Sequence, residues 1–241
     1  MGIFEIVLLA AGALLASTLA AIAGFGGAAV LLPILVLVFG VREAIPILTV
    51  AQLIGNGSRV WFNRRDLEIP VVGWFSLGGI PSALIGGAIF ASAPLDDLKR
   101  LLGIFLLFMV GYRHIRPNQM YRLPLRGFAL LGAISSFLSA LLGSVGPLMA
   151  PFFLSYGLVK GAYIGTEALA TVIMHVTKLV AYGNASLLNL HNIAVGVSLG
   201  PIMVFGSFVG KKVVDWMPEK LFVLVIEATL LVAGLGFLIY G

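Results

Sequence analysis

The chain alternates long apolar segments with short polar connections. Charges, prolines and glycines divide it into eight hydrophobic segments, which are residues 4–39, 44–62, 68–92, 98–112, 127–157, 162–182, 190–210 and 219–240. Runs of about 20 apolar residues are long enough to span a bilayer core. The runs are continuously apolar and do not alternate, so they predict helices and not the strands of a barrel. The pattern therefore predicts an all-α integral membrane protein.

The eight segments form two halves of four segments that resemble each other. We predict a first repeat at 1–112, a linker with four arginines and two prolines at 113–126, and a second repeat at 127–241. Corresponding positions include Pro33 and Pro151, Thr49 and Thr166, Arg59 and Lys178, Gly86 and Gly210, and Pro94 and Pro218. A period of about 120 residues is typical of a duplicated transporter.

Each half opens with a long apolar segment that glycines interrupt. As one helix the first segment would be about 54 Å long, whereas the bilayer core is about 30 Å thick, so it must tilt strongly or break. The glycines of the interruptions are Gly24, Gly26 and Gly27 in the first half and Gly143 and Gly146 in the second. Half-helices that point their N-termini at the membrane midplane would form an anion site. The alternative is close helix packing through small residues; two equivalent breaks, each followed by proline, favour the site.

The second segment of each half carries a polar stripe on one helical face. The stripes are Thr49, Gln52, Asn56 and Arg59 in the first half and Glu167, Thr171, His175 and Lys178 in the second. A charge inside the bilayer costs about 2.5–3.5 kcal/mol on insertion scales and usually faces a cavity or a partner. Matching stripes therefore suggest a polar path between the halves. The alternative for Arg59 and Lys178 is snorkelling to the membrane surface.

Three residues are candidates for proton coupling. His175 shares a face with Glu167 and Lys178, and histidine titrates near neutral pH. Glu227 lies in the middle of an otherwise apolar segment. It is either a proton-coupling carboxylate or a structural hydrogen-bond partner of another helix, and its sequence context fits both interpretations.

The basic residues predict the orientation of the chain. If the first segment of each half folds back as a re-entrant hairpin, each half crosses the membrane three times. Lys and Arg then divide ten against three, with 64, 65, 113, 116, 122, 126, 160, 211, 212 and 220 on one side and 42, 99 and 100 on the other. If every segment crosses once, they divide six against seven. The positive-inside rule favours the first arrangement. It predicts inverted repeats, a cytoplasmic linker at 113–126 and both termini outside.

Composition excludes several functions. Of the 241 residues, 60% are apolar and 10% charged, whereas soluble domains carry about 25% charged residues. The net charge of +5 comes from basic residues that stand singly or in pairs between apolar segments, so no nucleic-acid partner is expected. Cysteine is absent. There is no metal-ligand cluster, nucleophile elbow or P-loop lysine, so we expect neither an enzyme nor a bound cofactor or metal.

The duplicated pattern resembles the sulfite exporter TauE/SafE family of small bacterial anion transporters. The resemblance rests on the glycine break, the proline after it, and then Ala44 and Thr49 or Ala162 and Thr166. Ala28 stands where a further glycine is often seen, and the second break has fewer glycines and a shorter spacing to its proline. The resemblance covers essentially the whole chain. It implies transport of sulfite, an organosulfonate or a related sulfur-containing anion, coupled to an ion or proton gradient.

We therefore expect a secondary transporter of the cell membrane that holds a small anion near the midplane between the repeats. Its partners would be the anion, a coupling ion or proton, and the lipid bilayer. The candidate ligands are Gly24, Gly26, Gly27, Thr49, Gln52, Asn56, Arg59, Gly143, Gly146, Thr166, Thr171, His175 and Lys178; Glu167, His175 and Glu227 are the candidates for proton coupling. An anion channel and a membrane subunit of a larger complex are the alternatives.

Overall fold

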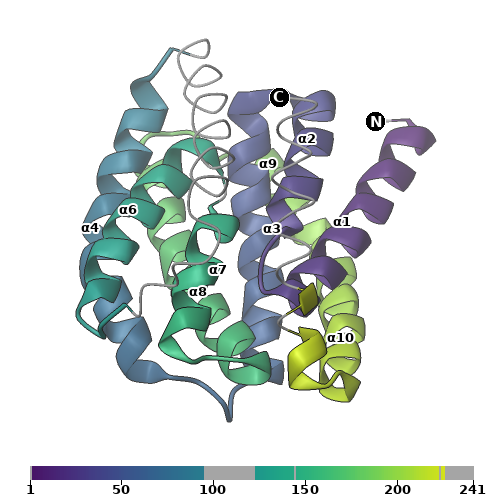
Figure 1. Cartoon of the computed structure of the whole chain (residues 1–241). Coiled ribbons are helices and arrows are strands. Elements are labelled where there is room, and N and C mark those ends of the chain that lie inside the picture. Colours follow the sequence, from purple (N-terminus) through teal and green to yellow (C-terminus); the bar gives the residue numbers. More distant parts are fainter. Residues whose placement is uncertain (1, 95–122, 144, 223, 226–241) are drawn as a thin grey trace.

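A computed structural model describes residues 2–94, 123–143, 145–222 and 224–225, and the regular elements in these ranges are all helices (Figure 1). The predicted all-α class is confirmed for this part of the chain. The predicted segment 98–112, most of the linker 113–126 and most of the segment 219–240 lie outside the described residues.

Within the described ranges, four stretches are long and apolar enough to cross a membrane. They are α1 (Ile3–Ala23), α4 (Ile69–Ser92), α8 (Lys160–Asn184) and the consecutive helices α9 (Leu190–Ser198) and α10 (Gly200–Trp216). α3 (Val41–Phe62) has the length of a span, but it is more polar because it carries the predicted polar stripe. The shorter apolar helices are α2 (Gly27–Phe39), α6 (Gly127–Leu142) and α7 (Gly146–Tyr156).

Both long opening segments break at the predicted glycines. α1 ends at Ala23 and α2 begins at Gly27; α6 ends at Leu142 and α7 begins at Gly146. α1 and α2 run antiparallel: a Cβ atom on Gly27 would lie 3.1 Å from that of Ala20, and one on Gly12 would overlap Ile34. The first opening segment therefore folds back on itself.

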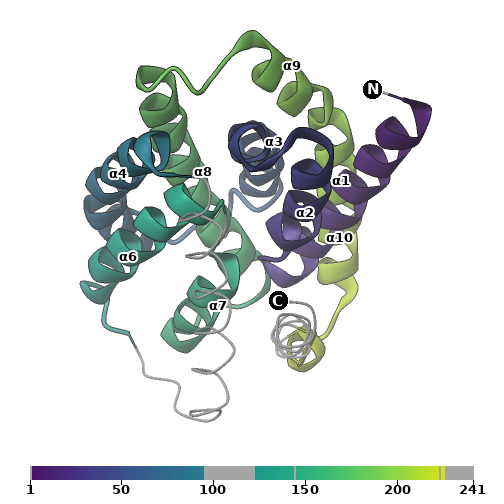
Figure 2. The same ribbon diagram turned by 90° about the horizontal axis from the view of Figure 1, so that it is seen from above.

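The two halves interlock. Viewed from above, α3 and α8 lie side by side between α1, α2 and α10 on one side and α4, α6 and α7 on the other (Figure 2). α10 thus packs on α1 of the first half, and α4 packs on α6 of the second. A Cβ atom on Gly86 would lie 2.7 Å from the carbonyl oxygen of Phe137, and one on Gly210 would lie 2.8 Å from that of Thr18. Because glycine has no side chain, Gly86 lets α4 approach α6 closely, and Gly210 lets α10 approach α1 closely.

The basic residues of the connections gather at one end of the bundle. The turns 63–68 and 157–159 and the end of α10 lie together at the lower end of Figure 1. These segments and their flanks carry Arg64, Arg65, Lys160, Lys211, Lys212 and Lys220, and Arg126 at the start of α6 lies 6.0 Å from the ring of Trp74 on α4. Arg42 lies at the opposite end, where it donates to the carbonyl of Ala91 at 3.1 Å. Most basic side chains of the described connections therefore lie at one end, together with Asp66, Glu68, Asp215 and Glu219.

Candidate functional site

The two helix breaks face each other inside the bundle. Gly24, Gly26 and Gly143 adopt left-handed backbone conformations with φ of 80°, 96° and 83°, which glycine reaches without steric cost. A Cβ atom on Gly146 would lie 2.6 Å from that of Phe25, so the first break packs directly on the second. The site is therefore shared between the halves.

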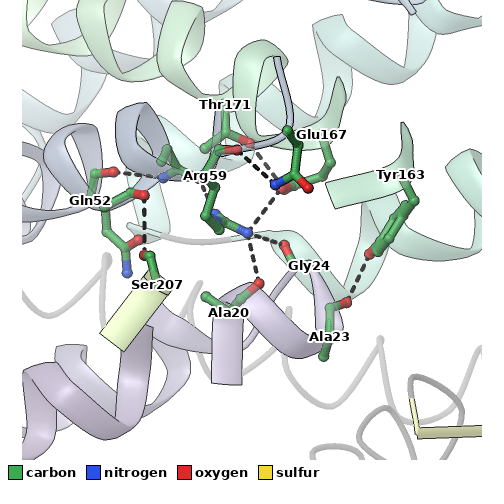
Figure 3. Close-up of polar contacts among 12 residues, drawn as sticks. Ala20, Ala23, Gly24, Gln52, Arg59, Tyr163, Glu167, Thr171 and Ser207 are labelled. Carbon is green, nitrogen blue, oxygen red and sulfur yellow. Dashed lines mark hydrogen bonds and ion pairs between the residues drawn. The ribbon is translucent and has the colours of Figure 1, made fainter. Parts of the chain in front are cut away.

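Arg59 closes the broken end of α1. The last carbonyls of a helix have no partner within the helix, and inside a membrane no bulk water replaces one. The guanidinium Nη1 of Arg59 donates to the carbonyl oxygens of Ala20 and Gly24, each at 2.9 Å, and the hydroxyl of Tyr163 donates to that of Ala23 at 3.1 Å (Figure 3). A cation at the C-terminal end of a helix is also favoured by the helix dipole. Arg59 therefore caps a helix that ends inside the bundle.

The same guanidinium joins α3 to α8. Nη1 of Arg59 lies 3.5 Å from Oε2 of Glu167, and both side chains are buried. The other carboxylate oxygen of Glu167 accepts from the hydroxyl of Thr171 at 3.0 Å, and Nη2 of Arg59 donates to the side-chain oxygen of Asn56. This network ties the two polar stripes together through one ion pair (Figure 3).

The second break is closed differently. The hydroxyl of Tyr182 donates to the carbonyl of Ala140, near the end of α6, at 2.7 Å. Nζ of Lys178 lies 3.2 Å from the hydroxyl oxygen of Ser139. The side chain of Lys178 is fully buried, and among the described residues no carboxylate lies within 4 Å of its ammonium group. Among the described residues, Arg59 has a counter-ion in Glu167, whereas Lys178 has none.

A small cavity with both polar and apolar lining residues lies where the breaks and stripes meet. Its volume is about 40 Å³, room for about three water molecules. Its lining comprises Ala20, Gly24, Phe25, Gly26, Gly27, Ala28, Gln52, Asn56, Arg59, Ser139, Gly143, Val145, Gly146, Met149, Glu167, Thr171, Met174 and His175. Nε2 of Gln52 and Nδ1 of His175 are buried without a hydrogen-bond partner among the described residues. No side chain of the described residues caps the N-terminus of α2, so its first N–H groups remain available at the cavity.

Most predicted site residues reach this cavity. The structure places there Gly24, Gly26, Gly27, Gln52, Asn56, Arg59, Gly143, Gly146, Thr171 and His175, together with the predicted proton carrier Glu167. Three predicted ligands do not line it: Thr49 donates to the carbonyl of Ile45, Thr166 accepts from the backbone N–H of Glu68, and Lys178 lies behind Ser139. Glu227 is outside the described residues. That any of these residues binds substrate or carries a proton stays a prediction.

Sequence reasoning missed two lining residues that matter to the geometry. Phe25 separates the glycines of the first break and packs on Gly146 of the second. Ser139 stands one turn before the second break, as Ala20 stands one turn before the first. Its position in an apolar helix, four residues before Gly143, is a signal in the sequence that could have identified it.

Within the described ranges, no group of three His, Asp or Glu side chains could hold a metal ion. The buried polar groups of the cavity are instead suited to hydrogen bonding and charge pairing.

The long apolar helices place the protein in the class of multispanning α-helical membrane proteins, with a small cavity among the helices. The family model of the sulfite exporter TauE/SafE matches residues 9–237, nearly the whole chain, and the chain belongs to this family. The members of this family are membrane transporters of anions and not enzymes. No curated protein and no solved structure matched the chain.

Proposed function

We propose that the protein is a secondary transporter that carries sulfite or a closely related sulfur oxyanion through the cavity between the two helix breaks. The two halves would be inverted repeats, with the cavity near the membrane midplane. Support comes from the opening helices, since α1 starts at the upper end of Figure 1 and α6 at the lower end. The matched contacts of Gly86 with Phe137 and of Gly210 with Thr18 also support the repeat.

The balance of buried charge is the observation that best supports an anion as the substrate. Among the described residues the bundle buries two cations, Arg59 and Lys178, against the single carboxylate of Glu167. A buried charge without a partner is strongly unfavourable, so an anion in the cavity would complete the balance. The amide of Gln52 and the free N–H groups at the start of α2 are donors that an oxyanion can accept.

The size of the cavity favours a compact substrate. A volume of about 40 Å³ suits a four-atom oxyanion better than an extended sulfonate with an organic tail. Within the expected group of sulfur-containing anions, sulfite is the compact member. An organosulfonate would require a wider conformation of the breaks.

Two lining residues support coupling to a proton. Within the part of the chain that the structure describes, Nδ1 of His175 is buried at the cavity without a partner, and Glu167 is held there by Thr171 and the ion pair with Arg59. A proton on either group would alter the charge that faces the substrate. We propose that one of them, or Glu227, couples transport to the proton gradient, with the linker 113–126 cytoplasmic and both termini outside.

Binding to purified protein tests this proposal. The melting temperature is measured with sulfite, thiosulfate, sulfoacetate, taurine and sulfate, because a ligand of the folded state raises it by mass action. We expect a saturable rise with sulfite. The substitution Gln52→Ala should weaken sulfite binding by about tenfold, because a hydrogen bond to a charged group contributes about 1.5–3 kcal/mol.

Thr49→Ala is the matched control, since Thr49 lies one turn earlier on the same stripe but outside the cavity. It should leave sulfite binding within about twofold of the natural protein. Absence of a melting shift with every anion would overturn the anion proposal. Unitary currents across a planar bilayer, in place of a saturable flux into proteoliposomes, would show a channel.

A further inference from the structure

Lys178 has an ammonium group that the cavity itself does not use. The residue lies on α8, the only partner of its Nζ among the described residues is Ser139, and its side chain does not line the cavity. In this conformation the side chain of Lys178 therefore does not reach the cavity, although the sequence predicts it as a direct ligand of the substrate. Ser139 stands between the ammonium group and the cavity.

The hydrogen bond fixes what the hydroxyl of Ser139 can do. An ammonium group only donates, so the oxygen of Ser139 accepts from Lys178, and its own O–H remains to donate. Some buried hydroxyls donate to the carbonyl four residues earlier, as Ser17 does to Ala13 and Thr49 to Ile45. Ser139 makes no such bond within the described residues. Its O–H is therefore a free donor at the cavity.

The contrast with Arg59 shows why this donor matters. Arg59, at the equivalent position of the first half, is engaged by two carbonyls, an amide oxygen and the carboxylate of Glu167. Among the described residues, Lys178 has one acceptor, the neutral hydroxyl of Ser139. The uncompensated positive charge of Lys178 therefore lies directly behind the free hydroxyl of Ser139. A charged donor also polarises the hydroxyl that it binds, which strengthens the next hydrogen bond.

We infer that Ser139 is a ligand of the transported anion and that Lys178 is a positioning residue that acts through it. This inference rests on the proposed function and names a ligand of the same cavity. Lys178 holds the oxygen of Ser139 so that the O–H faces the anion, and it supplies the balancing charge from behind. Gln52 approaches from α3, so the anion would be held between one donor from each half. Such directed donors select an oxyanion over a halide.

The test compares three serine variants by sulfite binding to the purified full chain. Ser139→Ala should raise the dissociation constant by about tenfold or more, as expected for a lost hydrogen bond to a charged group. Ser139→Thr keeps the hydroxyl and should retain binding. Ser135→Ala is the matched control, because Ser135 is a fully buried hydroxyl one turn earlier on α6 that does not line the cavity. It should leave the dissociation constant unchanged within about twofold.

The role of Lys178 is tested by a double-mutant cycle. Lys178→Met should weaken sulfite binding about as much as Ser139→Ala, and the double variant should be little worse than either, because residues that act as a unit are not additive. Lys178→Arg, which keeps the charge, should restore part of the affinity. The melting temperature without ligand is recorded for each variant, so that a loss of binding is separated from a loss of folding.

Each outcome decides a different statement. Sulfite binding by Ser139→Ala equal to that of the natural protein would overturn the inference and leave the proposed function intact. Additive losses in the double variant would show that Lys178 acts independently of Ser139, which overturns its positioning role. If the natural protein binds none of the anions, the proposed function fails and the inference fails with it. Should Lys178→Met not fold, the comparison of Ser139→Ala with Ser139→Thr still decides whether the hydroxyl is a ligand.

Discussion

Arg59 can occupy the interior of an apolar bundle because the broken end of α1 supplies carbonyl oxygens that need donors. Its guanidinium serves Ala20 and Gly24 at that end and pairs with Glu167 on α8. The fork of an arginine suits this task, since it offers several donors in one plane. The role is distinct from both of the roles that the sequence left open, which were substrate binding and snorkelling, although Arg59 also lines the cavity.

We predict that Arg59→Ala lowers the free energy of unfolding by about 3–5 kcal/mol, because removing one partner of a buried ion pair leaves the other uncompensated. Denaturation in mixed detergent micelles, followed by circular dichroism, measures the loss. Adding Glu167→Gln should recover part of it, because the unpaired carboxylate disappears. Arg126→Ala, at an exposed basic residue, is the control. An Arg59→Ala variant as stable as the natural protein would contradict the capping role.

Helical periodicity was sufficient to place Gln52, Asn56 and Arg59 on one face and to bring them to a common cavity. It could not predict which atoms on other helices those side chains meet, because Ala20, Gly24 and Glu167 lie 35 to 108 residues from Arg59 in the chain. The same limit applies to Lys178, whose contact with Ser139 spans 39 residues. Contacts of this kind depend on how the helices pack and not on the pattern within one helix.

Among the elements, the pair of α4 and α6 shows how closely two helices approach in this protein. A Cβ atom on Gly78 would overlap the carbonyl oxygen of Ala129, and one on Gly132 would overlap that of Phe75. Small residues permit such contact in membranes, where dispersion between helices replaces the hydrophobic effect as the source of association.

We predict that Gly78→Ala lowers the free energy of unfolding by about 1–3 kcal/mol or more, because the added methyl group meets backbone that cannot rotate away. Gly73→Ala tests the same substitution five residues earlier on α4, where no described atom lies within 4 Å of the added Cβ. This control should be neutral or slightly stabilising, since alanine favours the helix by about 1 kcal/mol over glycine. Equal losses in both variants would contradict close packing at Gly78.

The helix breaks were the elements most readily predicted from the sequence. An apolar segment too long for the bilayer must tilt strongly or break, and glycine is the residue that permits the left-handed turn seen at Gly24 and Gly143. The pairing of α4 with α6 and of α1 with α10 was not predicted. The sequence presents the repeats one after the other, whereas the structure packs an element of each repeat on the opening helix of the other.

At the scale of the whole molecule, this interlocking makes the halves one unit. Neither the cavity nor the cap on α1 is complete within one half, because Glu167 and Tyr163 come from the second half and Gln52 and Arg59 from the first. The predicted boundary at 113–126 therefore divides the sequence more clearly than it divides the packed bundle.

Orientation in the membrane can be tested at both ends of the bundle. The chain has no cysteine, so single cysteines at Ser92 and Asn184 on one end, and at Asp66 and Glu219 on the other, label without background. We predict that Ser92→Cys and Asn184→Cys react with a membrane-impermeant maleimide in intact cells. Asp66→Cys and Glu219→Cys should react only after permeabilisation, because the positive-inside rule predicts that the basic end faces the cytoplasm.

The reverse pattern of labelling would show the opposite orientation. Mixed reactivity between two sites at the same end would contradict the arrangement of the helix ends in Figure 1.

The cap on α1 also has a consequence for how the protein is made. The hydroxyl that binds the carbonyl of Ala23 belongs to Tyr163, 140 residues later in the chain, and the carboxylate that pairs with Arg59 belongs to Glu167. A ribosome delivers α1 and α2 to the membrane long before it synthesises α8. Until then the C-terminal end of α1 lacks the hydroxyl of Tyr163, and Arg59 lacks the carboxylate of Glu167. Completion of the first hairpin therefore belongs to a late stage of biogenesis, and a chain truncated before α8 leaves that hairpin unfinished.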